Sequence, residues 1–186
     1  MIIRKANIGD AEAITTYLLL AMGDIIYQFI GRKNDEQAKA FMLHFVKGRN
    51  NQYAYENCWV AEDDHRVVAA ACCYEGGMLR QLRRPVLDYI KNEYQHTLSL
   101  EDETQEGEVY LDCLCVDPSQ QGKGIGSKML QFLINEYLLK QNHPLGLLVD
   151  PDRLAARRLY LRMGFRVMGH KDFAGKKMEH LQINQN

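Results

Sequence analysis

The chain has 186 residues, of which 25% are charged and 46% hydrophobic, as expected for a folded protein with one buried core. The formal net charge of -1 excludes the strongly basic surface on which nucleic-acid binding depends. No apolar run approaches the roughly 20 residues of a membrane-spanning helix, and the N-terminus is too charged for a signal peptide, so we expect a cytoplasmic protein.

Hydrophobic periodicity and turn residues predict elements in the order β-α-α-β-β-α-β-α-β-α-β-β. The first part holds a strand at 2–6, helices at 10–25, with Asp10 as the expected N-cap, and at 35–47, and strands at 58–62 and 66–74. Residues 78–94 are expected to be largely helical, with Pro85 as a kink or a helix start, and residues 101–108 form an acidic, solvated loop. The second part holds a strand at 109–116, a helix at 124–141, a strand at 144–149 and strands at 165–169 and 177–183. Between the strands at 144–149 and 165–169, Asp152 caps a helix in which Ala155, Leu159 and Met163 face inward and which Gly164 ends.

Two features of this order predict the fold class. Strands and helices alternate in the second half, which indicates an α/β protein with a mixed sheet and helices on both faces. The strand at 109–116 is apolar on both faces and therefore suits the middle of the sheet. We expect a single domain over 1–186, with an insertion at about 76–107.

Cysteine and histidine spacing predicts neither disulfides nor a metal site. The five cysteines form no C-x-x-C pair, and we expect them to be small buried residues in strands. The six histidines form no pair with metal-ligand spacing.

A glycine-rich segment follows the strand at 109–116. Glycines at positions 122, 124 and 126 precede a helix, and three glycines at a helix start are costly unless the backbone there has a use. Free N–H groups at a helix start bind anions, and glycine lets the backbone approach a phosphate closely. The spacing is neither that of a P-loop nor that of a dinucleotide-binding fold. The segment therefore predicts a pyrophosphate site at residues 121–127.

Two blocks of sequence resemble the GCN5-related N-acetyltransferase (GNAT) superfamily. The first runs from Val116-Asp117-Pro118 through Gln121-Gly122-Lys123-Gly124-Ile125-Gly126 and matches the family pattern Q/R-x-x-G-x-G/A. The second combines Leu147-Leu148-Val149, Ala156 and Leu159-Tyr160-Leu161-Arg162-Met163-Gly164-Phe165. The resemblance covers roughly residues 109–169 and implies a GNAT-like fold, with a mostly antiparallel sheet that is splayed at the cofactor site.

The resemblance also implies a donor, acetyl-CoA, and residues that would bind it. The backbone of Gln121, Gly122, Lys123, Gly124, Ile125, Gly126 and Ser127 would hold the pyrophosphate, and Leu114, Cys115 and Val116 would pair with the pantetheine arm. Tyr160 matches a tyrosine that protonates the departing thiolate. Arg153 stands where the family commonly has asparagine, and could reach a CoA phosphate or point to solvent.

Direct attack of an amine on the thioester calls for a base, because an ammonium group is no nucleophile. Glu108 and Asp112 are the candidates, with Glu62 weaker and a water-borne proton as the alternative. Strand alternation places Tyr110, Asp112, Leu114 and Val116 on one face. Asp112 in a buried strand is unusual, and a purely structural hydrogen-bonding role is equally compatible with it.

The expected function is transfer of an acetyl group to a primary amine of a small molecule or peptide. The acidic stretch at 101–108 favours a cationic acceptor, such as a polyamine, an aminoglycoside or a peptide amine. A covalent step on Cys115 stays open, as does a homodimer. The alternative is a non-catalytic acyl-CoA-binding or regulatory module with the same fold.

Overall fold

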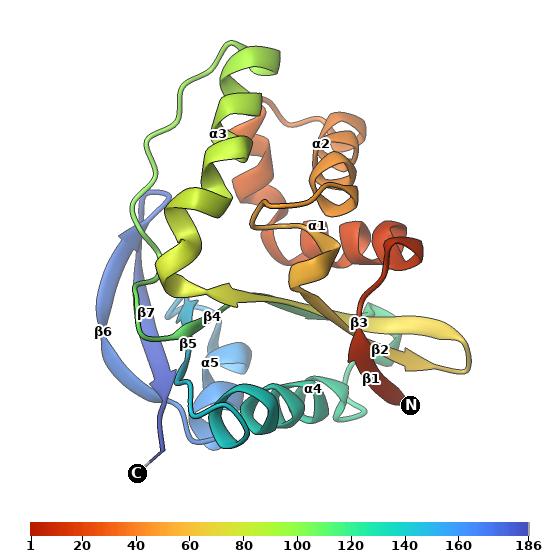
Figure 1. Ribbon diagram of the computed structural model, residues 1–186, viewed down its shortest axis with the longest axis vertical. Helices are drawn as coiled ribbons and strands as arrows, with labels where there is room; N and C mark the ends of the chain where they lie inside the picture. The colour runs from red at the N-terminus through yellow and green to blue at the C-terminus, as the bar shows by residue number, and fades with distance from the viewer. Residues whose placement is uncertain (186) are drawn as a thin grey trace.

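The structure, a computed structural model, describes residues 1–185 and contains one seven-stranded sheet (Figure 1). The strands are β1 (Ile2–Lys5), β2 (Cys58–Asp63), β3 (Arg66–Glu75), β4 (Val109–Val116), β5 (Leu145–Val149), β6 (Arg166–Phe173) and β7 (Lys176–Ile183). The helices are α1 (Ala11–Phe29), α2 (Asp35–Lys47), α3 (Leu79–Tyr94), α4 (Ile125–Leu133) and α5 (Leu154–Arg162). The strand order is β1-β2-β3-β4-β5-β7-β6, and every neighbouring pair is antiparallel except β4 and β5.

Helices cover both faces of the sheet, as the sequence predicts. Figure 1 shows α1, α2 and α3 gathered on one side and α4 on the other. The first hydrophobic cluster joins α1, α2 and α3 to one face through buried residues that include Leu18, Phe41 and Ile90. The second cluster joins α4 to the opposite face, and apolar residues of α5 pack against it. The mixed, mostly antiparallel sheet between the two layers confirms the predicted fold class.

The sheet opens between its two parallel strands. β4 and β5 pair only at Val109 with Leu145 and at Tyr110 with Gly146. Beyond these positions β4 continues to Val116 without a partner on that side, while β5 pairs with β7 along its whole length. The two strands therefore part towards their carboxyl ends, which confirms the splay implied by the resemblance.

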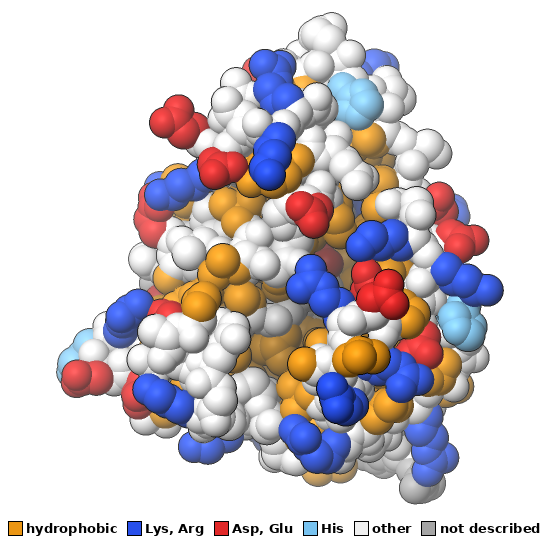
Figure 2. Space-filling model, turned by 180° about the vertical axis from the view of Figure 1, so that it is seen from behind, with side chains coloured by type: hydrophobic (Ala, Val, Ile, Leu, Met, Phe, Trp, Pro, Cys, Tyr) orange, Lys and Arg blue, Asp and Glu red, His pale blue; other side chains and the backbone are white. Residues whose placement is uncertain are grey.

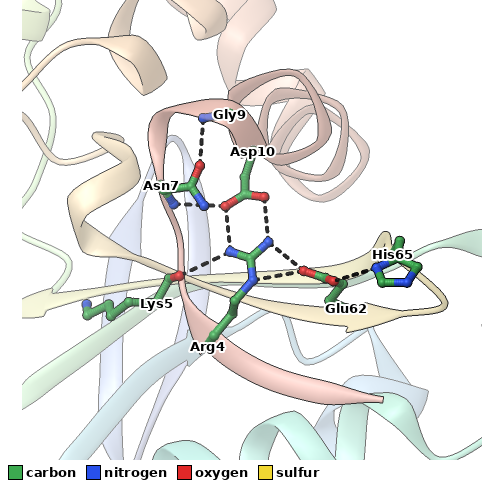
Figure 3. A network of polar contacts seen from close by, with 7 residues as sticks. All are labelled: Arg4, Lys5, Asn7, Gly9, Asp10, Glu62 and His65. Atoms are coloured by element: carbon green, nitrogen blue, oxygen red, sulfur yellow. Dashed lines mark hydrogen bonds and ion pairs between the residues drawn. The ribbon is translucent and has the colours of Figure 1, made fainter.

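The start of α1 is fixed by a charged network rather than by the predicted cap. The Asp10 side chain makes no capping hydrogen bond and instead accepts two from the guanidinium of Arg4, at 2.8 and 2.9 Å, and one from the N–H of Asn7. Arg4 also donates to Glu62 at 2.9 Å (Figure 3). Hydrogen bonds from Arg4 hold the pKa of Asp10 below its usual value. The network joins β1, α1 and β2, and Glu62 is engaged within it.

Three other element boundaries differ from the prediction. The helix after the glycines ends as α4 at Leu133 and continues as a π-helix, Ile134–Leu139, in which Lys140 donates to the carbonyl of Asn135. Asp152 does not cap α5, because that helix begins at Leu154 with Arg153 at the cap position. Pro85 lies inside α3 without ending it.

The inward face of α5 also differs in one residue. Ala155 is exposed, and Ala156 packs against the second cluster together with Leu159 and Met163. Gly164, with φ +99°, ends the helix as predicted. None of the helices within residues 1–185 combines the length and apolar composition that a bilayer crossing needs.

Candidate active site

The connection from β4 to α4 has the conformation that its glycines predict. Gly122 and Gly124 have φ values of +80° and +77°, in the left-handed region where residues with a β-carbon are strained. A β-carbon at either position would meet no atom within 4 Å, so the backbone conformation, not crowding, requires glycine there. At Gly126 a β-carbon would lie 3.6 Å from Val116, so the first turn of α4 packs closely on the end of β4.

The N–H groups of this connection are free to bind a ligand. In the described part of the chain, the backbone N–H groups from Gln121 to Ser127 donate to no protein oxygen, and Lys128 is the first to donate backwards, to Gly124. Residues 121–124 are exposed. Unsatisfied N–H groups at a helix start, together with the helix dipole, favour an anion. The geometry therefore suits the predicted pyrophosphate site.

The open edge of β4 offers a second set of backbone groups. The N–H of Asp117 donates to Val68 on β3 at 2.9 Å, and alternate residues of an antiparallel strand bond to the same neighbour. The backbone groups of Leu114 and Val116 therefore point away from β3, into the splay. The Val116 carbonyl accepts a hydrogen bond from the Gln121 side chain at 3.3 Å. Leu114 and Val116 can therefore pair with an extended ligand, whereas the backbone of Cys115 faces β3, which speaks against its predicted pairing with the pantetheine arm.

A β-bulge at Asp112 changes which side chains share a face of β4. Cys72 pairs with Cys113 whereas Cys73 pairs with Leu111, so Asp112 is the extra residue. One inserted residue reverses the alternation beyond it. Tyr110 and Cys113 consequently belong to the first cluster, and Leu114 and Val116 pack against the second. The prediction that Tyr110, Asp112, Leu114 and Val116 share one face is therefore wrong.

Asp112 is half-buried in the sheet, and few donors stabilise its charge. The Nε2 atom of Gln52 lies 3.5 Å from one carboxylate oxygen. Burial, followed by the negative charge of Glu103, raises the pKa of Asp112 to about 8, although Gln52 and Arg83 act in the opposite direction. A carboxyl group with this pKa can accept a proton from an amine at mildly alkaline pH.

Tyr160 on α5 has a hydroxyl group with no protein hydrogen-bond partner within the described residues. Its ring packs edge-on against Phe165, with ring centroids 5.8 Å apart. Burial, and then the nearby thiols of Cys113 and Cys73, raise the pKa of the phenol. The phenol therefore keeps its proton at neutral pH, but the raised pKa makes it a weaker acid, so its role as a general acid stays a prediction.

Glu108 lies at the closed end of the splay, where β4 and β5 pair. It is fully buried, and its carboxylate accepts hydrogen bonds from Thr104 at 2.8 Å and Gln182 at 2.9 Å. The Nε2 atom of His180 also lies 2.9 Å from a carboxylate oxygen. Burial opposes ionisation, but the bonds from His180 and Thr104 outweigh it and lower the pKa of Glu108. With its oxygens engaged away from the open edge, Glu108 has a structural role, and we do not retain it as a base.

Two other candidates have less support from their positions. Arg153 is exposed at the start of α5, and its N–H donates to the Asp150 carbonyl at 2.9 Å, so its contact with a CoA phosphate stays a prediction. The thiol of Cys115 is half-buried, and burial raises its pKa. A neutral thiol is a poor nucleophile, which disfavours a covalent step. The other four cysteines are free and buried, as predicted.

Sequence reasoning missed a polar cluster beside Asp112. Glu103 and Glu108 were expected in a solvated loop, yet they are 2% and 0% exposed. Glu103 meets Arg83 of α3 and Tyr74 of β3. No signal in the sequence points to this cluster, because Glu103 sits in an ordinary acidic run and its partners lie far away along the chain.

A cavity of about 590 Å³ opens beside the β4–α4 connection, between the start of α1 and Asp117-Pro118. Arg66 Nη2 lies 2.7 Å from Asp117 at its edge. Figure 2 shows the face opposite to that of Figure 1, with hydrophobic side chains in a central hollow and Lys and Arg side chains around it. Such a surface suits a ligand with an apolar arm and anionic groups. Among residues 1–185, no three His, Cys, Asp or Glu side chains converge as metal ligands would.

Comparisons with known proteins agree with this geometry. The model of the "Acetyltransferase (GNAT) family" matches residues 28–165. The chain is 37% identical over 79 residues to the spermine/spermidine N(1)-acetyltransferase of Bacillus subtilis (strain 168). These residues make up 42% of this chain and 52% of that protein. The chain thus spans about half the length of the curated relatives it matches.

Two solved structures show the same fold. An N-acetyltransferase from Staphylococcus aureus Mu50 has a TM-score of 0.84 at 18% identity, over 98% of this chain and 100% of that one. The yncA structure from Salmonella typhimurium, with its cofactor acetyl-CoA, has a TM-score of 0.58 at 20% identity, over 99% of this chain and 93% of that one. The family model covers more than half of the chain, so the protein belongs to the acetyltransferase (GNAT) family.

Proposed function

We propose that this protein is an acetyl-CoA-dependent N-acetyltransferase that acts on a primary amine of a small molecule or peptide. One observation carries the proposal: the parting of β4 and β5 leaves a strand edge free between the N–H groups of residues 121–127 and the half-buried Asp112. That arrangement provides a place for an anionic group, an extended arm and a reacting carbonyl in sequence along one strand edge. Membership of the GNAT family supports this use of the edge.

The donor would be held by backbone groups. The pyrophosphate would accept hydrogen bonds from the free N–H groups of residues 121–127, which the left-handed conformations of Gly122 and Gly124 present to solvent. Amide groups of the pantetheine arm would pair with Leu114 and Val116 in the manner of an added strand. The bound acetyl-CoA supplies the activated acyl group, and the protein supplies the position and the proton transfers.

Asp112 and Tyr160 would carry the protons. Asp112 takes a proton from the ammonium group of the acceptor, and the neutral nitrogen then attacks the thioester carbonyl carbon. The new C–N bond forms as the C–S bond breaks, and the departing sulfur receives the proton of the Tyr160 hydroxyl. The nitrogen then loses its extra proton to the Tyr160 oxygen, which gives the neutral amide and restores the phenol, and Asp112 releases its proton to solvent. Proton transfer by positioned side chains contributes about 10²–10⁴-fold to the rate of such a reaction.

A cationic acceptor, such as a polyamine, is the substrate class we favour. The name of the Bacillus subtilis relative supports it, because that protein is a spermine/spermidine N(1)-acetyltransferase. The acidic stretch at 101–108 gives less support than its composition suggests: Glu103 and Glu108 are buried, and the exposed Asp102 already pairs with Arg80 at 2.7 Å.

The test combines binding with turnover. Isothermal titration with acetyl-CoA, CoA and ATP should show binding of the first two only. A panel of polyamines, aminoglycosides, peptides and anionic amines, read by thiol release, should show turnover with cationic amines. Binding of CoA without turnover of any amine would instead support the non-catalytic acyl-CoA-binding module. Lasting acetylation of Cys115 after acetyl-CoA alone, detected by mass spectrometry, would contradict direct transfer.

The dependence on Asp112 has its own measurement. In the wild type, kcat/KM should rise with pH and reach half its limit near the pKa of Asp112, about 8. Asp112→Asn should lose about 10²-fold or more in kcat at pH 8 and lose this rise. A variant that keeps both rate and profile would show that water, not Asp112, carries the proton.

A homodimer and a cytoplasmic location stay predictions. Analytical sedimentation tests the first, and cell fractionation tests the second.

A further inference from the structure

A buried polar cluster from α3, β3 and the loop after α3 acts on Asp112. Glu103, Arg83 and Tyr74 are 2%, 5% and 5% exposed and come from the loop after α3, from α3 itself and from β3. The Tyr74 hydroxyl donates to Glu103 Oε1 at 3.0 Å, and Glu103 Oε2 lies 3.0 Å from Arg83 Nη2. Arg83 Nη1 donates to the carbonyl of Glu101 at 3.0 Å. The segment between α3 and β4 is thus anchored directly beside the sheet residue proposed as the base.

Glu103 and Asp112 compete for the donors of this cluster. A phenol carries one proton, and Tyr74 gives it to Glu103, although Tyr74 also lies close enough to Asp112 to lower the pKa of that carboxyl group. Arg83 likewise pairs with Glu103. The other donor to Asp112 is the distant Nε2 atom of Gln52, at 3.5 Å. Two carboxyl groups that share one set of donors in a buried site cannot both hold a negative charge easily.

We propose that Glu103 is a positioning residue that sets the charge of Asp112, because it holds Tyr74 and Arg83 and adds a negative charge beside that carboxyl group. The inference rests on the proposed function, in which Asp112 accepts the proton of the acceptor amine. Burial raises the pKa of Glu103 above its usual value, although Arg83 and Tyr74 act in the opposite direction and favour its ionised form. When Glu103 is ionised, Asp112 keeps its proton to a higher pH and is a stronger base once it has lost it. The loop after α3 would therefore tune the pH range of the reaction.

The other titratable groups around Asp112 are neutral near pH 8, which leaves Glu103 and Arg83 as the charges that act on it. They are phenols and thiols on the loop before β2, on β3 and on β4. The hydrogen bond with Cys58, followed by burial, raises the pKa of Cys72, and burial raises the pKa of each of the others. These groups are Tyr53, Cys72, Cys73, Tyr74, Tyr110 and Cys113. Of the two charges, Glu103 acts on Asp112 more strongly than Arg83 does.

The experiment compares Glu103→Gln with Glu106→Gln, which removes an exposed carboxylate from the same loop. Glu103→Gln removes the competing charge and frees the Tyr74 proton, so the rise of kcat/KM with pH should move down by about one to three pH units. Glu106→Gln should leave the profile at the wild-type position. An unshifted profile for Glu103→Gln would contradict the proposal.

A second variant controls for a loss of stability, since Glu103→Gln removes the buried carboxylate that pairs with Arg83 and leaves it the Glu101 carbonyl and the more distant Asp102. Arg83→Gln/Glu103→Gln removes both charges. Because Glu103 acts more strongly, the profile of the double variant should move in the same direction by a smaller amount. A shift to higher pH, or none, would overturn the inference.

A direct titration separates this inference from the proposed function. The carboxyl carbon of Asp112, assigned by comparison with Asp112→Asn, is followed by ¹³C NMR against pH in the wild type and in Glu103→Gln. A lower titration midpoint in Glu103→Gln supports the role of Glu103, even if no amine in the panel is acetylated. An unchanged midpoint contradicts it, whatever the activity. A shifted midpoint with an unshifted rate profile would leave the role of Glu103 in place and remove Asp112 as the base.

Discussion

At the scale of residues, burial has opposite consequences for the two side chains proposed to transfer protons. Burial disfavours the charged form of both, so it raises the pKa of the Asp112 carboxyl group to about 8 and raises that of the Tyr160 phenol. For the carboxyl group, the higher pKa makes the anion a stronger base. For the phenol, the higher pKa makes the group a weaker acid, so its contribution to the rate has to be measured.

Tyr160→Phe tests the residue-scale proposal. The change removes one hydroxyl group that has no protein partner, so the fold and acetyl-CoA affinity should stay as they are. The kcat should fall by about 10²-fold, because the departing thiolate loses its proton donor. Steady-state kinetics and isothermal titration with acetyl-CoA measure the two quantities.

Tyr137→Phe is the matched control, since its hydroxyl accepts a hydrogen bond from Trp59 at 2.8 Å, away from β4. Its kcat should stay within a few-fold of the wild type. Equal rates for Tyr160→Phe and the wild type would show that Tyr160 only packs against Phe165.

At the scale of elements, the site depends on two local departures from regular structure. The bulge at Asp112 turns the end of β4 so that Leu114 and Val116 face the second cluster. The connection after it takes left-handed conformations at Gly122 and Gly124, which leave its N–H groups unpaired. The first N–H groups of any helix have no partner within the helix, and these glycine conformations present them to solvent, where a ligand can reach them.

Gly124→Ala should weaken donor binding through the backbone. At φ +77° an alanine is strained by about 1–2 kcal/mol, and the loop can relieve the strain only by turning its N–H groups. We expect a loss of about tenfold in CoA affinity, measured by isothermal titration.

The control for this change is Gly23→Ala, inside α1, where a β-carbon would meet no atom within 4 Å. That variant should keep its CoA affinity and gain about 0.5–1 kcal/mol in stability against urea. Equal CoA affinities for the two variants would argue against the loop as the pyrophosphate site.

At the scale of the whole molecule, the open edge of β4 begins where the short pairing between β4 and β5 ends. Thr104, Glu108, His180 and Gln182 connect the loop before β4 to β7 across β5. A β-carbon at Gly146 would overlap the Glu108 carboxylate, so β5 can pass this point only with glycine. The position at which β4 and β5 part is therefore fixed by a buried carboxylate far from the chemistry.

Glu108→Gln should lower the stability of the protein by about 1–3 kcal/mol at pH 7, because a neutral amide cannot accept all three hydrogen bonds. In the wild type, the folded-state pKa of Glu108 is below its unfolded value. The stabilisation is thus complete above about pH 4.3 and is lost as pH falls through the folded pKa.

Urea unfolding from pH 3 to pH 7 measures this dependence, with the exposed Glu106→Gln as the control. The wild type and the control should lose stability towards pH 3 more steeply than Glu108→Gln does. Parallel curves for Glu108→Gln and the wild type would show that the carboxylate charge is not what holds the closed end.

The sequence predicted the parts of the site that lie close together along the chain. The glycines at 122, 124 and 126 follow directly on a buried strand, so their spacing alone indicated an anion site at a helix start. Element order and the two matching blocks indicated the GNAT fold. Boundaries were less reliable at Asp10 and Asp152, where the polar side chain that resembled a cap bonds elsewhere or not at all.

Only the tertiary structure decided how residues that are distant in the sequence meet. Alternation placed Asp112 and Leu114 on one face, and the bulge, set by pairing with β3, separated them. Composition placed Glu103 and Glu108 in solvent, and partners on α3, β3 and β7 buried them. The donor site is local in sequence and could be predicted from it. The base and its charge depend on contacts across the sheet, which residue spacing does not encode.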